Sequence, residues 1–468
     1  MVAAFAAIVV LSIVIGFGRR LDVGAKVAGV ALALLIIALP FVLIPQLERA
    51  RTASAPPINV PAPEDLNAIE PRAGGATLPK PAAPTPVPTT APPAIDLPDA
   101  PEVASAEETE AVDAQAGRVA DGKFDTVEVL FGTDREVIRA DRSDAENVSF
   151  GAGRARKLTL GASTVSIPKD HTPGLIERPW EVSVFSITLY RQKEDPAKHF
   201  TVQKLGILDE PAFIAAANAA LDGGGEDAGT AVVFVHGYNN DFESALFRTA
   251  QLAYDMRFTG APFMYSWPSA AGYTTYEYDQ QSARQASDHL RAFIEIVARK
   301  TQAQKVHLVA HSMGNDVLME ALRELRFRYG TQEELKLSQV ILAAPDVDRD
   351  VFKRLARQIR GISDGVTLYA SANDRALQIS RTYAGGIARA GDVPEDGPVV
   401  LPGVDTIDVS ETQQAFLSAN HNSFAEASEL VKDISALVRT GVRPPARRTP
   451  SLVAVPSGAA TYWRFPGP

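Results

Sequence analysis

Ser312 lies in the sequence VAHSMG (residues 309–314), where an apolar run of strand type meets a run with helical spacing. The segment follows the pattern G-x-S-x-G, with Ala310 in place of the first glycine. Small residues at 310 and 314 allow the chain to turn sharply. A serine on such a turn presents its hydroxyl above the amino terminus of the helix. We therefore predict that Ser312 is a nucleophile; a serine that merely caps the helix is the alternative.

A serine hydroxyl is a weak nucleophile and needs a base beside it. At strand–turn–helix sites of this kind the partners follow in the order serine, acid, histidine. The chain has seven histidines, and only His421 comes after Ser312. It lies in the loop between the last predicted strand and the last predicted helix. We therefore predict His421 as the base, with a surface histidine as the alternative.

Two aspartates are candidates for the acid. Asp374 follows the strand-like run 366–370 and is the first choice. Asp346 follows the preceding run, 339–344, and is the second choice. It also belongs to a cluster with Asp348 and Asp350 that fits the amino-terminal cap of a helix.

Acyl transfer also requires donors for the oxyanion that develops on the substrate. The backbone N–H of Met313 follows the nucleophile directly. The second donor is predicted to be the N–H of Tyr238 in the loop HGYNN (residues 236–240), where Gly237 permits close approach. Aromatic residues after the next strand are predicted to bind an apolar acyl or aryl group, or else simply to pack: Tyr265, Trp267, Tyr273 and Tyr276.

Short apolar runs alternate with amphipathic helical segments between residues 121 and 440. Strands are predicted at 126–131, 158–167, 180–190, 231–235, 262–267, 305–310, 339–344, 366–370 and 406–409, and helices at 211–221, 242–256, 282–298, 316–327, 350–359 and 425–438. This alternation predicts an α/β fold with a mainly parallel sheet covered on both faces. Ligands of such sheets bind at the carboxyl ends of the strands, where the residues above fall.

The ends of the chain differ from this region. Uncharged apolar runs at 2–18 and 27–45 predict two transmembrane helices within residues 1–50, with the basic connector between them in the cytoplasm. Residues 51–120 are rich in proline and alanine and are predicted to form a disordered tether. Residues 441–468, again rich in proline and glycine, are predicted to be a disordered tail.

Composition excludes several classes of function. The chain of 468 residues contains no cysteine, which rules out a thiolate nucleophile and a cysteine–metal site. A net charge of −10 argues against a nucleic-acid-binding protein. The sequence shows no phosphate-binding loop and no cluster of metal ligands, so we expect neither a metal nor another cofactor.

Four motifs closely resemble a bacterial α/β-hydrolase family whose members are labelled as uncharacterised esterase/lipase-superfamily enzymes with a domain of unknown function. They are VHGYN (235–239), YSWPS (265–269), AHSMG (310–314) and AAPD (343–346), accompanied by FGTDR (131–135) and VSIP (165–168). The resemblance covers residues 124–440. It implies the α/β-hydrolase fold and supports Ser312 as nucleophile, but it identifies no substrate.

These features together predict a membrane-anchored serine hydrolase that cleaves an ester or thioester of a small molecule or lipid. An acyltransferase with the same triad and a catalytically idle tethered scaffold are the alternatives. The charge of the connector places the hydrolase domain in the periplasm, with the anchor in the bacterial inner membrane.

Overall fold

The computed structural model describes residues 122–139, 148–184, 187–272, 275–331, 333–383, 385–412 and 424–467. The two predicted transmembrane segments and the tether lie outside these ranges. Within them, no helix combines the length and the apolar character that a membrane crossing would require.

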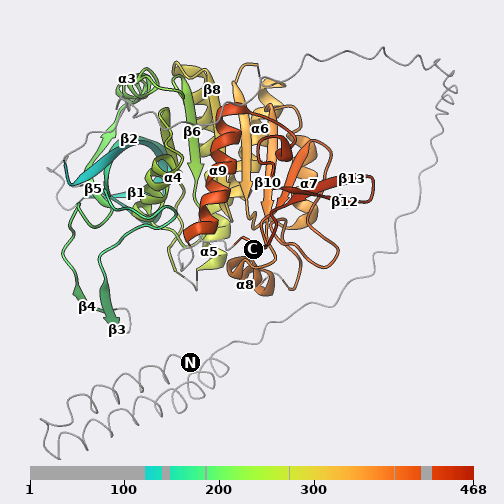
Figure 1. The fold of residues 1–468 in the computed structure, drawn as a ribbon. Helices are drawn as coiled ribbons and strands as arrows, with labels where there is room; N and C mark the ends of the chain where they lie inside the picture. The colour runs from blue at the N-terminus through green and yellow to red at the C-terminus, as the bar shows by residue number, and fades with distance from the viewer. Residues whose placement is uncertain are drawn as a thin grey trace, which may run out of the picture. The chain divides into compact units, whose positions relative to one another are not determined.

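One large sheet organises the described residues, with the strand order β12-β13-β11-β10-β9-β8-β6-β7-β1-β2-β5 (Figure 1). Neighbouring strands run parallel from β1 through β7, β6, β8, β9, β10 and β11 to β13, and β2, β5 and β12 add antiparallel edges. The strands are β1 (Phe124–Arg139), β2 (Val148–Pro168), β5 (Thr201–Leu208), β6 (Thr230–Val235), β7 (Ala261–Ser266), β8 (Lys305–His311), β9 (Leu337–Ala343), β10 (Gly365–Ala370), β11 (Val404–Asp408), β12 (Val453–Ser457) and β13 (Ala460–Arg464).

Helices cover both faces of the sheet, and this explains why β6, β9 and β10 are buried along their whole length. Residues of α3, α5, α6 and α7 form one apolar core with the sheet, and residues of α4 and α9 form the other. Figure 1 shows α4 and α9 on the near face. The helices are α3 (Glu210–Leu221), α4 (Phe242–Asp255), α5 (Tyr276–Glu295), which continues as a π-turn (Ile296–Lys300), α6 (Gly314–Tyr329), α7 (Arg349–Gln358), α8 (Arg375–Tyr383) and α9 (Phe424–Thr440).

The alternation of strands and helices predicted from the sequence is confirmed between β6 and α9. Several details differ. No strand was predicted at residues 201–208, which form β5. The single strand predicted at 180–190 is a separate hairpin of β3 (Glu181–Val184) and β4 (Ile187–Arg191). β1 and β2 are longer than predicted, and α8 was not predicted because its short sequence lacks an extended apolar stripe.

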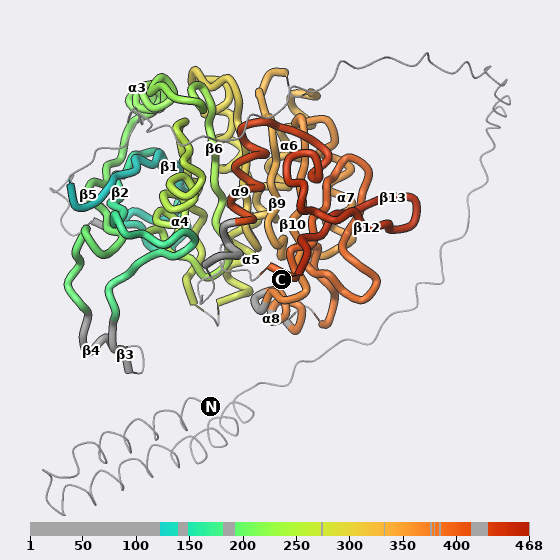
Figure 2. The backbone as a smooth tube through the Cα atoms, viewed as in Figure 1, coloured from blue at the N-terminus to red at the C-terminus, as the bar shows by residue number. Residues whose placement is uncertain are grey.

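The structure corrects the expectation of a disordered tail. Residues 441–467 include β12 and β13, which lie together near the end of the chain (Figure 2). β13 extends the sheet beside β11. The guanidinium of Arg448 donates two hydrogen bonds of 3.0 Å to the fully buried carboxylate of Asp433 in α9. Arg464 Nε donates one hydrogen bond of 2.8 Å to the buried carboxylate of Asp408. These long-range ion pairs hold a segment whose own composition contains little apolar surface.

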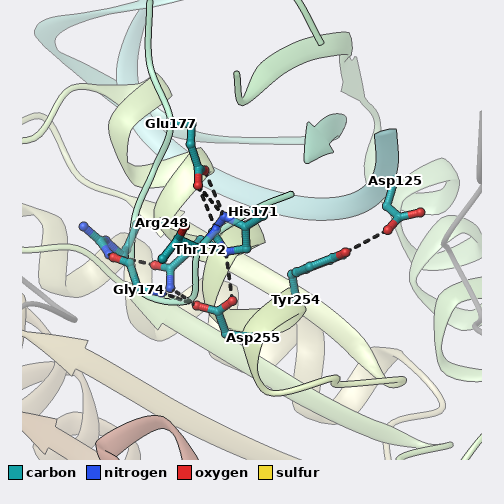
Figure 3. A network of polar contacts seen from close by, with 9 residues as sticks. Asp125, His171, Thr172, Gly174, Glu177, Arg248, Tyr254 and Asp255 are labelled. Carbon is teal, nitrogen blue, oxygen red and sulfur yellow. Dashed lines mark hydrogen bonds and ion pairs between the residues drawn. The ribbon is translucent and has the colours of Figure 1, made fainter. Parts of the chain in front are cut away.

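His171 fastens the segment after β2 to the last turn of α4 (Figure 3). Its Nδ1 lies 2.9 Å from Glu177 Oε2, and its Nε2 lies 2.9 Å from Asp255 Oδ1. Asp255 Oδ2 also accepts a hydrogen bond of 2.8 Å from the N–H of Gly174. Burial acts to lower the pKa of His171, but the hydrogen bonds to Asp255 and Glu177 outweigh it and raise the pKa to about 9.

Because this pKa lies above the ordinary value of 6.5, the charged imidazole stabilises the folded state. That contribution is complete below pH 6.5 and is lost as the pH rises through about 9. We expect His171→Gln to lower the free energy of unfolding, measured in urea, by about 3 kcal/mol near pH 6, and by much less above pH 9. Lys169→Gln, which removes an exposed ion pair with Asp125, should cost about 0.5 kcal/mol. A cost of His171→Gln that does not change with pH would contradict the prediction.

Candidate active site

Ser312 occupies a strained turn between β8 and α6. Its backbone φ is +51°, in the left-handed region that residues other than glycine rarely adopt. Both backbone polar groups of Ser312 form hydrogen bonds with the segment at the end of β9. The N–H of Ser312 donates to the carbonyl of Ala343 at 3.0 Å, and its carbonyl accepts from the N–H of Asp346 at 3.2 Å. The end of β9 therefore holds the conformation that the turn would not keep alone.

Two glycines bring the loop after β6 against this turn. A Cβ atom added to Gly237 would lie 2.8 Å from the Cβ of Ser312, and one added to Gly314 would lie 2.3 Å from the carbonyl oxygen of His236. Real Cβ atoms do not approach other heavy atoms so closely. The loop of residues 236–240 and the Ser312 turn thus touch only because both positions lack a side chain.

The two predicted oxyanion donors lie on these two segments. Met313 precedes the first residue of α6, with its side chain buried. Tyr238 follows Gly237, and the carbonyl of Gly237 is held from two sides. The Nδ1 of His236 lies 2.9 Å from that carbonyl oxygen, and Asn240 Nδ2 donates to it at 3.2 Å. Tyr238 and Met313 therefore flank the Ser312 turn.

The two candidate acids follow adjacent strands but have different surroundings. Asp374 is 8% exposed after β10, and its Oδ1 accepts the N–H of Leu377 at 3.0 Å at the start of α8. The Asp346 carboxylate accepts a hydrogen bond from the Tyr276 hydroxyl at 3.0 Å and another from Ser380, and it pairs with Arg389 at 3.2 Å. Burial raises the pKa of Asp346, although Ser380, Arg389 and Tyr276 act against that rise. Asp346 thus belongs to a buried polar cluster with α8.

The predicted base, His421, lies outside the described residues, as does Tyr273. The flanking elements are β11, which ends at Asp408, and α9, which begins at Phe424. Because β11 is the parallel neighbour of β10, residues 409–412, which follow β11, lie at the carboxyl ends of the strands, as Ser312 and Asp374 do.

The structure corrects the prediction of an aromatic binding wall for two of its members. Tyr265 and Trp267 are fully buried. The Tyr265 hydroxyl lies 2.8 Å from Asp134 Oδ1, and the Trp267 indole donates to the carbonyl of His236 at 2.7 Å. Both side chains are therefore committed to the core. Tyr276 is half-buried, and its ring meets that of Tyr238 edge to face at 5.4 Å.

Two buried arginines, Arg135 and Arg389, were not identified from the sequence. Arg389 is 6% exposed and Arg135 is 1% exposed. A charged residue at the end of a strand or in a polar loop ordinarily faces solvent, so composition carries no sign of their burial. The motif FGTDR contains Arg135, but nothing in that motif indicates what the side chain contacts.

A family model described as "Alpha/beta hydrolase of unknown function (DUF900)" matches residues 219–440, from the end of α3 to the end of α9. The search of curated proteins found no relative. Among solved structures, a mutant of the esterase rPPE is 11% identical, with a TM-score of 0.23, over 70% of this chain and 82% of that one. LpqC, a poly(3-hydroxybutyrate) depolymerase from Bordetella parapertussis, is also 11% identical, with a TM-score of 0.26, over 72% of this chain and 94% of that one.

The family match agrees with the parallel sheet, the helices on both faces and the serine turn after β8. Residues 219–440 of this chain match the model of the DUF900 family, which is described as α/β-hydrolases of unknown function.

Proposed function

We propose that this α/β-hydrolase is a serine hydrolase that cleaves an ester or thioester of a small molecule or lipid through an acyl-enzyme on Ser312. The observation that carries the proposal is the turn itself. A non-glycine residue at φ +51°, between a buried strand and a helix and in contact with Gly237, is the arrangement that presents a serine hydroxyl for attack. Backbone strain of this kind persists where its surroundings enforce it.

In the proposed reaction, His421 takes the hydroxyl proton of Ser312 as the serine oxygen attacks the substrate carbonyl carbon. The backbone N–H groups of Met313 and Tyr238 stabilise the resulting oxyanion. His421 then gives the proton to the leaving alcohol or thiol, and an ester on Ser312 remains. A water molecule, deprotonated by His421, cleaves that ester, releases the carboxylic acid and restores the serine.

We expect Ser312→Ala to abolish covalent labelling by a fluorophosphonate probe, since the probe reacts with an activated serine oxygen. The full chain, purified in detergent, would be labelled and analysed by mass spectrometry. Ser338→Ala is the matched control, because Ser338 is a buried serine near the start of β9. Labelling that survives in Ser312→Ala, or that disappears equally in Ser338→Ala, would refute the assignment.

The surroundings of the two aspartates favour Asp374 as the acid. The Asp346 carboxylate accepts hydrogen bonds from Tyr276 and Ser380 and pairs with Arg389, and Asp374 lies directly before α8, at the end of the neighbouring strand β10. We expect Asp374→Asn to lower kcat for p-nitrophenyl acetate by roughly 10²–10⁴-fold. Asp346→Asn should lower the free energy of unfolding more than it lowers kcat. The reverse pattern in kcat would assign the acid to Asp346.

We further propose that residues 2–18 and 27–45 anchor the chain in the bacterial inner membrane, with the hydrolase domain in the periplasm. The length and apolar character of both segments support this. Deletion of residues 1–50 is expected to move the chain from the carbonate-washed membrane fraction to the soluble fraction. Deletion of residues 56–101, within the tether, should leave it in the membrane fraction. A chain without residues 1–50 that stays membrane-bound would contradict the anchor.

A further inference from the structure

Arg135 is a buried cation that the proposed reaction does not use. It lies in β1, where the pairing with β2 shifts register on both sides of the residue. Such irregularities redirect a side chain out of the regular strand pattern. The side chain is enclosed, with 1% of the residue exposed. Burial lowers the pKa of Arg135 to about 10, so the guanidinium still carries its charge at neutral pH.

The guanidinium connects three segments around the Ser312 turn. Nη2 donates to the carbonyl of Asn240, in the loop after β6, at 2.7 Å. Nη1 donates to the carbonyl of Ser269, in the loop after β7, at 3.0 Å, and to that of Gly151, in β2, at 3.2 Å. Nε donates to the hydroxyl of Ser266 at 2.8 Å. Arginine has donors in a fixed planar array, so these contacts fix the segments relative to one another.

Arg135 also contributes to keeping His236 neutral. Burial and then the adjacent Arg135 charge lower the pKa of His236 to about 3, so the ring is neutral. The Ser266 hydroxyl accepts from Arg135 Nε, and its own proton can point to His236 Nε2 at 3.2 Å. Arg135 Nη2, which can only donate, approaches the same nitrogen at 3.5 Å. From these contacts we infer that Nε2 is the acceptor of the ring and that the proton lies on Nδ1.

The proton on Nδ1 determines how the next peptide is oriented. In this tautomer His236 Nδ1 donates to the carbonyl of Gly237 at 2.9 Å. That carbonyl and the N–H of Tyr238 belong to one planar peptide, where they point in opposite directions. Holding the carbonyl therefore also sets the direction of the Tyr238 N–H, the proposed oxyanion donor. The alternative tautomer would instead donate from Nε2 to the carbonyl of Trp267, 3.1 Å away, and release Gly237.

We propose that Arg135 is a positioning residue for the oxyanion site, acting through Ser266 and His236 on the peptide between Gly237 and Tyr238. This inference rests on the proposed serine-hydrolase function. It assigns to β1, which lies outside the family match at 219–440, a part in the chemistry at Ser312. Arg135 touches no reacting atom in this scheme. Its effect is to fix the direction of a hydrogen-bond donor before substrate binds.

The test compares Arg135→Met and Arg135→Lys with the wild-type full chain, using p-nitrophenyl acetate as substrate. Loss of one oriented oxyanion donor is expected to lower kcat by roughly 10²–10³-fold in Arg135→Met, while KM changes about threefold or less. Arg135→Lys keeps the charge but not the planar array, and its kcat should fall between the two. Arg443→Met is the matched control, because the Arg443 guanidinium likewise connects separate segments: it donates to the Asp405 carboxylate and to the carbonyls of Asp364 and Gly403, at the opposite end of β10 and β11. It should keep the wild-type kcat.

A second pair of variants decides the question even if Arg135→Met does not fold. Asparagine at 236 can offer a donor near the place of Nδ1, and glutamine can offer one near the place of Nε2. His236→Asn should therefore retain a higher kcat than His236→Gln. In ¹⁵N-histidine spectra of the wild-type chain, His236 should carry its proton on Nδ1.

The outcomes separate this inference from the proposed function. A wild-type kcat in Arg135→Met, a kcat of His236→Gln equal to or above that of His236→Asn, or a proton on Nε2 would overturn the positioning role. If Ser312→Ala hydrolyses the ester like the wild type, the proposed function itself fails. If Ser312→Ala is inactive and Arg135→Met is fully active, only the positioning role fails.

Discussion

The left-handed backbone at Ser312 is the constraint on which the site depends. A serine gains nothing locally from φ +51°, and such a conformation costs about 1–3 kcal/mol, which the contacts of its neighbours must offset. Here β9 supplies a carbonyl and an amide to the turn, and Gly237 and Gly314 remove the atoms that would otherwise push it open. The parallel sheet thus maintains the strained conformation of this turn at the carboxyl end of β8. Ser312, Tyr238 and Asp374 follow the carboxyl ends of the parallel strands β8, β6 and β10.

Much of the fold was predictable because burial on both faces leaves a clear pattern in the sequence. β6, β9 and β10 are short apolar runs between amphipathic helices, and the structure confirms them. Ser312 was also predictable, because a strand-to-helix turn needs small residues at fixed spacing. Its placement in the turn follows from local geometry. The choice between Asp346 and Asp374 as the acid could not be made from local geometry, because it depends on groups as distant in sequence as Tyr276 and Arg389.

The remaining features could not be predicted for the same reason. Tyr265 and Trp267 are aromatic residues of the kind that line binding sites. Their polar atoms instead donate hydrogen bonds in the core, to Asp134 and to the carbonyl of His236. The segment after residue 440 has the composition of a disordered tail, yet ion pairs with the buried carboxylates of Asp433 in α9 and Asp408 in β11 anchor it. The sequence gives no sign that Arg135 is buried, because its carbonyl partners lie on other segments. In each case a polar contact between distant segments overrides what local composition indicates.

The carboxyl-terminal segment with β12 and β13 also neutralises charges inside the segment that the family model matches. Asp408 and Asp433 lie inside the segment that the family model matches, but the arginines that neutralise them, Arg464 and Arg448, lie beyond it. Buried carboxylates are tolerated when they are paired and are costly when they are alone. Residues 219–440 of this chain therefore depend on arginines outside that segment to neutralise two of their buried carboxylates. Relatives that lack an equivalent of β12 and β13 would need other residues at these two positions, so the identity of residues 408 and 433 should vary together with the presence of the carboxyl-terminal extension.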